Sequence, residues 1–392
     1  MAAVDDLRAQ VAGEVDKRRD GLIELSLKLH ANPELAFGEV QAAGWLTRYL
    51  EEAGFSLERG ICELATAFRA SYGEGKPVIA FLAEYDALPE VGHGCGHNII
   101  AAAAVGAGVA AKAAASRFGG TVMVIGTPAE ELYGGKIIMA ERGAFADVDM
   151  AMMVHPGARN VATWQALACQ TLDVEFFGRA SHAAARPEAG INALEAMIQS
   201  FTAINSLRQH IRNRARIHGI ITAGGEAANI VPAYSAGNFI VRAEDDSYLD
   251  GLKERVLNCF VAASVATEAR LEYRWGEVRY APLRNNLTMA RLFVKNMEFL
   301  GRPMLLRDAG DAFGSTDMGN VSQLVPGIHA EVAVAPPTVL IHSPDFTQAA
   351  ASEAAMDGLI ASAKALALTA ADLLASPQTV VEVEKEFSGE NG

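Results

Sequence analysis

Three apolar runs of strand length, separated by helical segments, constrain this chain more than any other feature. The runs lie at 77–85, 121–126 and 149–155, with helical patterns at 97–115 and 134–142 between them. Strands that alternate with helices predict a mainly parallel sheet with helices on both faces. Ligands bind at the carboxyl ends of strands in such sheets, so the residues that follow each run are the first candidates for a functional site.

The pattern changes near residue 168, where a second arrangement of elements begins. Its order, β-α-β-β-α-β, is that of a small split α/β sandwich. A chain of 392 residues is also too long for one ordinary core. We therefore expect a first domain formed by 1–168 and 282–392, interrupted by an inserted domain at 169–281. Helices are predicted at 4–30, 39–53, 190–212 and 250–266, and further strands at 172–177, 217–223, 235–243 and 269–273.

Charge and cysteine usage exclude several classes of protein. The net charge is −14, from 33 basic and 47 acidic residues, which makes nucleic acid an unexpected partner. The four cysteines are scattered and do not suggest a disulfide framework. The longest apolar run, 99–111, is too short to span a bilayer, and the polar N-terminal segment lacks the pattern of a signal peptide. We expect a cytoplasmic protein that has no membrane partner.

Side chains that could bind metal ions come at or after the ends of the predicted strands. Cysteine, histidine and glutamate together suit two transition-metal ions. A thiolate or carboxylate offsets the positive charge of the ions and can bridge them at short spacing. The candidates are Cys95 with His93 or His97 after the first run, one of Glu130 and Glu131 after the second, His155 at the end of the third, and His342 far downstream.

The adjacent carboxylates of Glu130 and Glu131 suggest a division of labour. From an extended loop they would point in different directions, so that one can bind metal while the other transfers a proton. The alternatives are ordinary. The pair could be the first turn of a helix, which favours acidic residues, and Cys95 could be a buried apolar thiol. The common position of all candidates at strand ends favours the metal site.

The inserted domain offers three further candidates. His182, in Gly178-Arg-Ala-Ser-His182, could stabilise an oxyanion or could be an exposed loop histidine. Arg242 could bind a substrate carboxylate through two hydrogen bonds or could be a surface arginine, and Asn229 lies in the same domain. Gly106-Ala-Gly108-Val-Ala-Ala111 fits a dinucleotide-binding fingerprint on paper. It follows a helical run instead of a strand, so we interpret it as helix packing.

Taken together, the motifs resemble those of the dinuclear metallohydrolases that include aminoacylase, glutamate carboxypeptidase and the plant indole-acetyl-amino acid hydrolases. The resemblance covers nearly the whole chain. The subgroup of aminobenzoyl-glutamate hydrolase and β-alanyl-lysine dipeptidase shares Glu-Tyr-Asp-Ala-Leu-Pro and Cys-Gly-His-Asn. The matching motifs are His30-Ala-Asn-Pro-Glu34, Asp86-Ala-Leu-Pro89, Cys95-Gly-His97, Thr127-Pro-Ala-Glu-Glu131, Gly178-Arg-Ala-Ser-His182, Asn229-Ile-Val-Pro232, Gly314-Ser-Thr-Asp317 and His342-Ser-Pro-Asp-Phe346.

The resemblance implies a catalytic zinc-peptidase-like domain with an α+β lid inserted at 169–281, which would also be the surface of a homodimer. Glu130 would be the general base and then the general acid. Asp86 would orient a metal ligand without binding metal itself. His182 would contact the oxyanion, often in the site of the partner subunit. The implied metal ligands are Cys95 as the bridge, with His97, Glu131, His155 and His342, and the implied substrate-binding residues are Asn229, Arg242, Gly314 and Ser315.

One departure concerns the metal ions. Many relatives carry His-x-Asp where this chain has Glu84-Tyr85-Asp86, and His97 is expected to replace the missing histidine. A thiolate ligand fits zinc, while manganese, cobalt or nickel are alternatives. The activity implied is hydrolysis of the amide bond of a small N-acyl or N-aroyl amino acid or a dipeptide by a metal-bridging hydroxide. Two alternatives remain: hydrolytic deamination of an aromatic amine, and a non-catalytic binding protein on the same scaffold.

Overall fold

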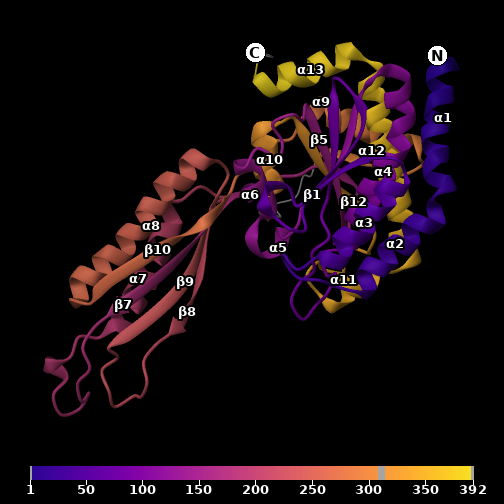
Figure 1. Cartoon of the computed structure of the whole chain (residues 1–392). Helices are drawn as coiled ribbons and strands as arrows, with labels where there is room; N and C mark the ends of the chain where they lie inside the picture. The colour runs from indigo at the N-terminus through magenta and orange to yellow at the C-terminus, as the bar shows by residue number, and fades with distance from the viewer. Residues whose placement is uncertain (1, 308–313, 390–392) are drawn as a thin grey trace. The chain divides into compact units, whose positions relative to one another are not determined.

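An eight-stranded sheet organises the larger part of the computed structural model, which describes residues 2–307 and 314–389. The chain divides into two units (Figure 1). The first comprises Met1–Gln165, Leu283–Asp311 and Asn320–Gly392, and the second comprises Ala166–Pro282 and Ala312–Gly319.

The central strands of the first unit are parallel. β3 pairs in parallel with β4 and β5, and β5 pairs in parallel with β12. β1 and β2 extend one edge in antiparallel fashion. In sheet order the strands are β1 (Ser56–Arg59), β2 (Phe68–Glu74), β4 (Gly120–Gly126), β3 (Val78–Ala83), β5 (Met150–Gly157), β12 (Gly327–Ala333), β6 (Val161–Thr163) and β11 (Leu305–Arg307).

Two long helices, α4 and α12, pack side by side and against the sheet, and α1 and α2 cover them (Figure 1). By length and composition α4 and α12 could cross a membrane, but 83% and 78% of their most apolar windows are buried inside the protein. The helices of this part are α1 (Ala2–Lys17), α2 (Arg19–Ala31), α3 (Val40–Glu52), α4 (His97–Phe118), α5 (Glu130–Tyr133), α6 (Gly135–Glu141), α9 (Leu287–Phe299), α10 (Met318–Leu324), α11 (Pro344–Ala349), α12 (Glu353–Ala375) and α13 (Pro377–Ser388).

The single helix predicted over 4–30 is wrong in one respect, because the chain breaks at Arg18. This residue leaves helical geometry, with φ −106° and ψ 5°, and separates α1 from α2. No proline or glycine marks the break in the sequence. Both helices contact α4, so the bend lets each bury its apolar face against the same neighbour. The break at Arg18 therefore results from tertiary packing and not from local helix propensity.

The second unit is a four-stranded antiparallel sheet with helices packed on it. The strand order is β10-β7-β9-β8, and Phe176, Phe239 and Phe260 lie in the core between sheet and helices. The predicted β-α-β-β-α-β order is confirmed, as is the fold class, a mainly parallel sheet with helices plus a separate α+β unit. The elements are β7 (Ala168–Phe177), α7 (Ala193–Leu207), β8 (Arg216–Ala223), β9 (Tyr234–Ala243), α8 (Asp246–Thr267) and β10 (Arg270–Tyr280).

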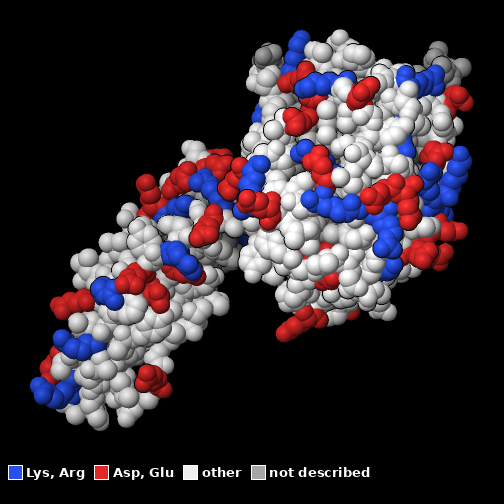
Figure 2. Space-filling model, viewed as in Figure 1, with Lys and Arg blue, Asp and Glu red and all other residues white. Residues whose placement is uncertain are grey.

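Basic and acidic side chains are interspersed over the face of the molecule that Figure 2 shows. Exposed ion pairs among the described residues include Arg59 with Glu51 and Arg212 with Asp245. On this face the excess of acidic residues is therefore spread among basic ones. Exposed pairs of this kind contribute little to the free energy of folding.

The glycines of the Gly106-x-Gly108 pattern are packing positions inside α4, as interpreted from the sequence. A Cβ on Gly106 would lie 2.8 Å from Leu22 Cδ1 on α2 and 3.2 Å from Ala363 Cβ on α12. A Cβ on Gly108 would lie 2.4 Å from Val124 Cγ2 on β4. The absence of a side chain lets α4 approach its neighbours closely on two sides.

We predict that Gly108→Ala lowers the free energy of unfolding by about 1–3 kcal/mol, because the added methyl overpacks the contact with β4. Helix propensity alone would predict the opposite sign. The matched control is Gly44→Ala in α3, where nothing lies within 4 Å of the added Cβ. That variant should gain up to about 1 kcal/mol. Chemical denaturation measures both, and a stabilised Gly108→Ala protein would contradict the packing role.

Candidate metal centre

Two structural elements bring the first candidate residues together. β3 ends at Ala83, and Asp86 lies three residues beyond the carboxyl end of this inner strand. After a turn, Cys95 lies two residues before α4, and His97 is the first residue of that helix. Gly96 between them has φ 77°, and a Cβ there would lie 2.5 Å from Pro156 Cγ. A residue with a side chain would strain the turn, so glycine allows the backbone to carry both side chains into the site.

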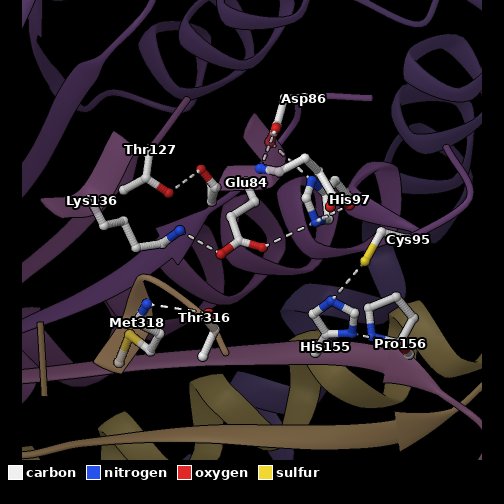
Figure 3. Close-up of polar contacts among 12 residues, drawn as sticks. Glu84, Asp86, Cys95, His97, Thr127, Lys136, His155, Pro156, Thr316 and Met318 are labelled. Atoms are coloured by element: carbon white, nitrogen blue, oxygen red, sulfur yellow. Dashed lines mark hydrogen bonds and ion pairs between the residues drawn. The ribbon is translucent and has the colours of Figure 1, made fainter. Parts of the chain in front are cut away.

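Asp86 holds two of the predicted ligands at once. Its Oδ1 lies 3.0 Å from His97 Nδ1 (Figure 3), and its Oδ2 accepts the backbone N–H of Glu131 at 3.0 Å. His97 and Asp86 are both buried. Because the carboxylate accepts at Nδ1, Nε2 is the ring nitrogen that His97 presents to the site, the arrangement expected when a carboxylate orients a metal-binding histidine.

Cys95 and His155 form the next contact of the cluster. Cys95 Sγ lies 3.3 Å from His155 Nε2 (Figure 3). His155 Nδ1 donates to the carbonyl oxygen of Pro156 at 2.8 Å, since that oxygen can only accept. The ring therefore directs the lone pair of Nε2 toward the thiol. His155 lies within β5, two residues before the strand ends at Gly157.

Glu130 and Glu131 lie in a short helix, α5, so the extended loop predicted for them is wrong and the first-turn alternative is right. The reason is local. Ala129 adopts a left-handed conformation with φ 62°, which starts the helix at Glu130. The buried carboxylate of Glu39 holds this turn by accepting the N–H of Ala129 at 2.9 Å. Successive residues of a helix still point in different directions, so separate roles for the two carboxylates remain compatible with the structure.

The structure brings all of the predicted metal ligands together with Glu130. Glu131 Oε1 lies 3.7 Å from His97 Nε2, and its Oε2 lies 3.6 Å from His342 Nε2. Among the described residues of the first unit, donor atoms within 4.8 Å of one another form three overlapping groups of three residues. Cys95, His97 and Glu131 each belong to two of them, and a thiolate such as that of Cys95 is a donor that can bridge two ions. The groups are Cys95/His97/His155, Cys95/Glu131/His342 and His97/Glu130/Glu131.

The donor atoms fit divalent metal ions. His97 Nε2 and Glu131 Oε1 are buried and have no hydrogen-bond partner among the described residues. Buried polar atoms are nearly always satisfied, so such atoms that face one another indicate a missing ligand. Sulfur, imidazole nitrogen and carboxylate oxygen are the donors that zinc and its neighbours in the first transition series accept.

Burial and the Asp86 carboxylate determine the direction in which the pKa values of the cluster shift. Burial lowers the pKa of His155 and raises the pKa of Cys95 well above its usual value. Burial would also lower the pKa of His97, but the Asp86 carboxylate overcomes it and raises that pKa well above the usual value. Without metal, the thiol and the His97 ring therefore retain protons, and a metal ion must displace them to bind.

Three buried residues beside the centre were not selected as site residues from the sequence. Burial alone would raise the pKa of Glu84, but the Lys136 ammonium and the His97 ring hold it at about 2. His329 on β12 is buried, and its ring centroid lies 5.6 Å from that of His155. Neither of its ring nitrogens has a hydrogen-bond partner among the described residues. Glu84 could have been found from its position two residues before Asp86, which places both on one side of an extended chain. No sequence pattern marked Lys136 as a residue of the site.

Arg242, Gly314 and Ser315 lie together in the second unit. Arg242 Nη1 donates to Ser315 Oγ at 2.7 Å, and that hydroxyl donates to the carbonyl oxygen of Leu167 at 2.8 Å. Gly314 accepts the N–H of Leu167 at 2.9 Å. Arg242 on β9 is opposite Cys169 on β7, so the group marks one end of the second sheet.

His182 and Asn229 lie together at the other end of that sheet. His182 pairs with Ile230, and Asn229 accepts the N–H of Ala183 at 3.0 Å. His182 Nδ1 accepts the N–H groups of Ala184 and Ala185, at 3.3 and 3.2 Å. The neutral ring therefore carries its proton on Nε2, where it can donate to a developing oxyanion.

The fold and the donor cluster define a metallohydrolase, and sequence comparison agrees. A profile of the peptidase family M20/M25/M40 matches residues 80–368. The chain is 38% identical to the Xaa-Arg dipeptidase of Mus musculus over 403 residues, which cover 98% of this chain and 93% of that protein. It is 34% identical to one of the p-aminobenzoyl-glutamate hydrolase chains of Escherichia coli over 311 residues, covering 74% of this chain and 64% of that one.

Among solved structures, a dinuclear metal binding peptidase of the M20 family from Bacillus subtilis has the same fold, with a TM-score of 0.73 at 21% identity. The match covers 92% of this chain and 99% of that one. The chain belongs to peptidase family M20/M25/M40. The predicted resemblance and the enzyme class, a hydrolase of the metallopeptidase and amidohydrolase kind, are confirmed. The number and identity of the metal ions in this chain, and the role of each residue, stay predictions.

We predict that Asp86→Asn weakens divalent metal binding by about 10–100-fold, because His97 and Glu131 lose the carboxylate that orients them. Competition with a chromogenic chelator measures the affinity, and elemental analysis after dialysis measures the bound metal. Asp147→Asn is the matched control, since it removes the same charge from an exposed position. Equal metal affinities of the two variants would contradict the orienting role.

Proposed function

We propose that this protein hydrolyses the amide bond of a small dipeptide or N-acyl amino acid at a centre of two divalent ions, with Glu130 as general base and then general acid. Zinc or manganese is the proposed metal, with cobalt or nickel as alternatives. The observation that carries the proposal is the cluster of Cys95, His97, Glu131, His155 and His342, whose overlapping groups of donor atoms include Glu130.

The site separates the tasks of binding metal and moving protons. When bound, two divalent ions would make a water molecule acidic near neutral pH and polarise the scissile carbonyl group. Glu130 lies within 4.8 Å of donor atoms of His97 and Glu131, close enough to take a proton from that water. The protonated Glu130 then gives its proton to the leaving nitrogen, which departs as an amine.

Recognition of the substrate is assigned to the second unit. The Arg242 guanidinium, positioned by Ser315, would bind the substrate carboxylate together with Asn229 and the backbone at Gly314. His182 would donate from Nε2 to the oxyanion. A free carboxylate on the product side is the feature that dipeptides and N-acyl amino acids share.

Arg242 and His182 cannot bind the same small substrate within one chain. They mark opposite ends of β9, and the eight residue steps from Tyr234 to Arg242 span about 26 Å. A dipeptide is much shorter than this span. We therefore propose that the protein works as a homodimer through its second unit, with His182 and Asn229 serving the site of the partner subunit.

Light scattering coupled to size-exclusion chromatography tests the dimer, which should show twice the chain mass of 41.5 kDa. His182→Ala and Arg242→Ala should each be nearly inactive alone. An equimolar mixture that exchanges subunits should regain activity, because one of its mixed sites carries neither substitution. A fully active monomer would refute the shared site.

The names of the relatives guide the choice of substrates. We predict that the protein loaded with zinc or manganese releases a free amino acid from one member of a panel of Xaa-Arg dipeptides, β-alanyl-lysine, p-aminobenzoyl-glutamate and N-acetyl amino acids. Product identification by mass spectrometry decides the bond cleaved. Release of ammonia without an amino acid would instead indicate deamination. Binding without turnover would indicate a non-catalytic binding protein.

We predict that Glu130→Gln lowers kcat by about 10²–10⁴-fold while leaving the metal content unchanged, because a carboxamide cannot transfer the proton. Glu131→Gln should lose metal as well as activity. Glu141→Gln, exposed at the end of α6, is the control for loss of one carboxylate. Wild-type turnover by the Glu130 variant would exclude it as the base.

A further inference from the structure

A lysine and a glutamate are buried as an ion pair beside the metal centre. Lys136 Nζ, on α6, lies 2.5 Å from Glu84 Oε1, just past the end of β3, and their side chains are 0% and 1% exposed. Charged residues are almost never buried so completely unless they are paired. Removing one partner of such a pair is costly, because a charge then remains in the interior.

The same carboxylate borders the metal ligands. Glu84 Oε2 lies 3.4 Å from His97 Nε2, and a Glu84 oxygen lies within 4.8 Å of a Glu130 oxygen. Figure 3 shows the Glu84 carboxylate between the Lys136 ammonium on one side and the His97 ring on the other. The two oxygens of Glu84 therefore face different partners, one the lysine and one the nitrogen that His97 offers to metal.

Apart from Lys136, most of the charged side chains beside Glu84 are negative. The carboxylates of Glu84, Asp86 and Glu131 lie beside the His97 ring, Glu130 lies within 4.8 Å of donor atoms of His97 and Glu131, and Cys95 adds a further negative charge when metal binding removes its proton. Each unneutralised negative charge strengthens the attraction for a divalent cation, and the effect is large where water is excluded. Lys136 is a fixed positive charge in contact with one of these groups.

We propose that Glu84 and Lys136 are a positioning pair that sets the charge of the metal centre. Lys136 holds the Glu84 carboxylate away from the metal ions and offsets its charge, so that the centre binds divalent ions less tightly than its carboxylates alone would. Glu84 in turn offsets Lys136, which would otherwise repel the ions. The proposal rests on the metal centre of the proposed function.

A mutant cycle tests the pair, with affinity for Zn²⁺ and Mn²⁺ measured by chelator competition and metal content by elemental analysis. Lys136→Met should bind both ions at least tenfold more tightly than the wild type, and Glu84→Gln at least tenfold more weakly. The double variant should return to within about threefold of the wild type. At saturating metal all variants should hold two ions.

A merely structural role predicts a different pattern. Both single variants would then bind metal more weakly, and this common direction would overturn the proposal. A double variant that holds only one ion at saturation would also overturn it, because Glu84 would itself be a metal ligand. Wild-type protein that binds no ion would instead overturn the proposed function.

The control is another ion pair of the first unit, Arg8 with Asp372, 2.8 Å apart and carried by α1 and α12. Asp372→Asn should lower the melting temperature without changing metal affinity. The single variants of the Glu84–Lys136 pair should also melt lower when metal-free, and the double variant should recover. If Lys136→Met does not fold, Glu84→Gln still decides at a temperature where its metal-free form is folded, because metal affinity equal to or higher than that of the wild type would overturn the proposal.

Discussion

The Asp86 carboxylate is the interaction on which the candidate site depends. One oxygen fixes the Nδ1 side of His97, and the other fixes the backbone at Glu131, so one side chain aligns the start of α4 with the start of α5. These segments follow different strands of the sheet. Since a metal centre needs its donor atoms aligned to within fractions of an ångström, a shared rigid acceptor achieves what two separate loops could not.

Close packing within the first unit supports this arrangement. α4 starts at His97 and runs through the core, where glycines at 106 and 108 let it lie close against α2, α12 and β4. The buried Glu39 carboxylate fixes the turn at Ala129 before α5. Burial and backbone hydrogen bonds thus hold the candidate proton-transferring and metal-binding groups in place, an arrangement that would reduce the cost of reorganisation during a reaction.

Much of this could be predicted from the sequence because it is local or periodic. The strands at 121–126 and 235–243 differ from β4 and β9 by one residue at most. The break at Arg18 could not be predicted, because it depends on how two helices meet a third. The helix at Glu130 and Glu131 was one of two open alternatives, and the left-handed Ala129 that begins it is held by Glu39, ninety residues earlier in the chain.

The sequence by itself determined the element order, the fold class and the set of candidate metal ligands, since these depend on hydrophobic period and on residue type. The tertiary structure decided which groups surround that set. Lys136 lies 52 residues after Glu84, and only the folding of α6 against the sheet end makes them a buried pair. It also decided that Arg242 and His182 mark opposite ends of one strand. Neither the pairing of Lys136 with Glu84 nor the separation of Arg242 from His182 can be predicted from the residues that flank them in the sequence, because both depend on how distant segments fold together.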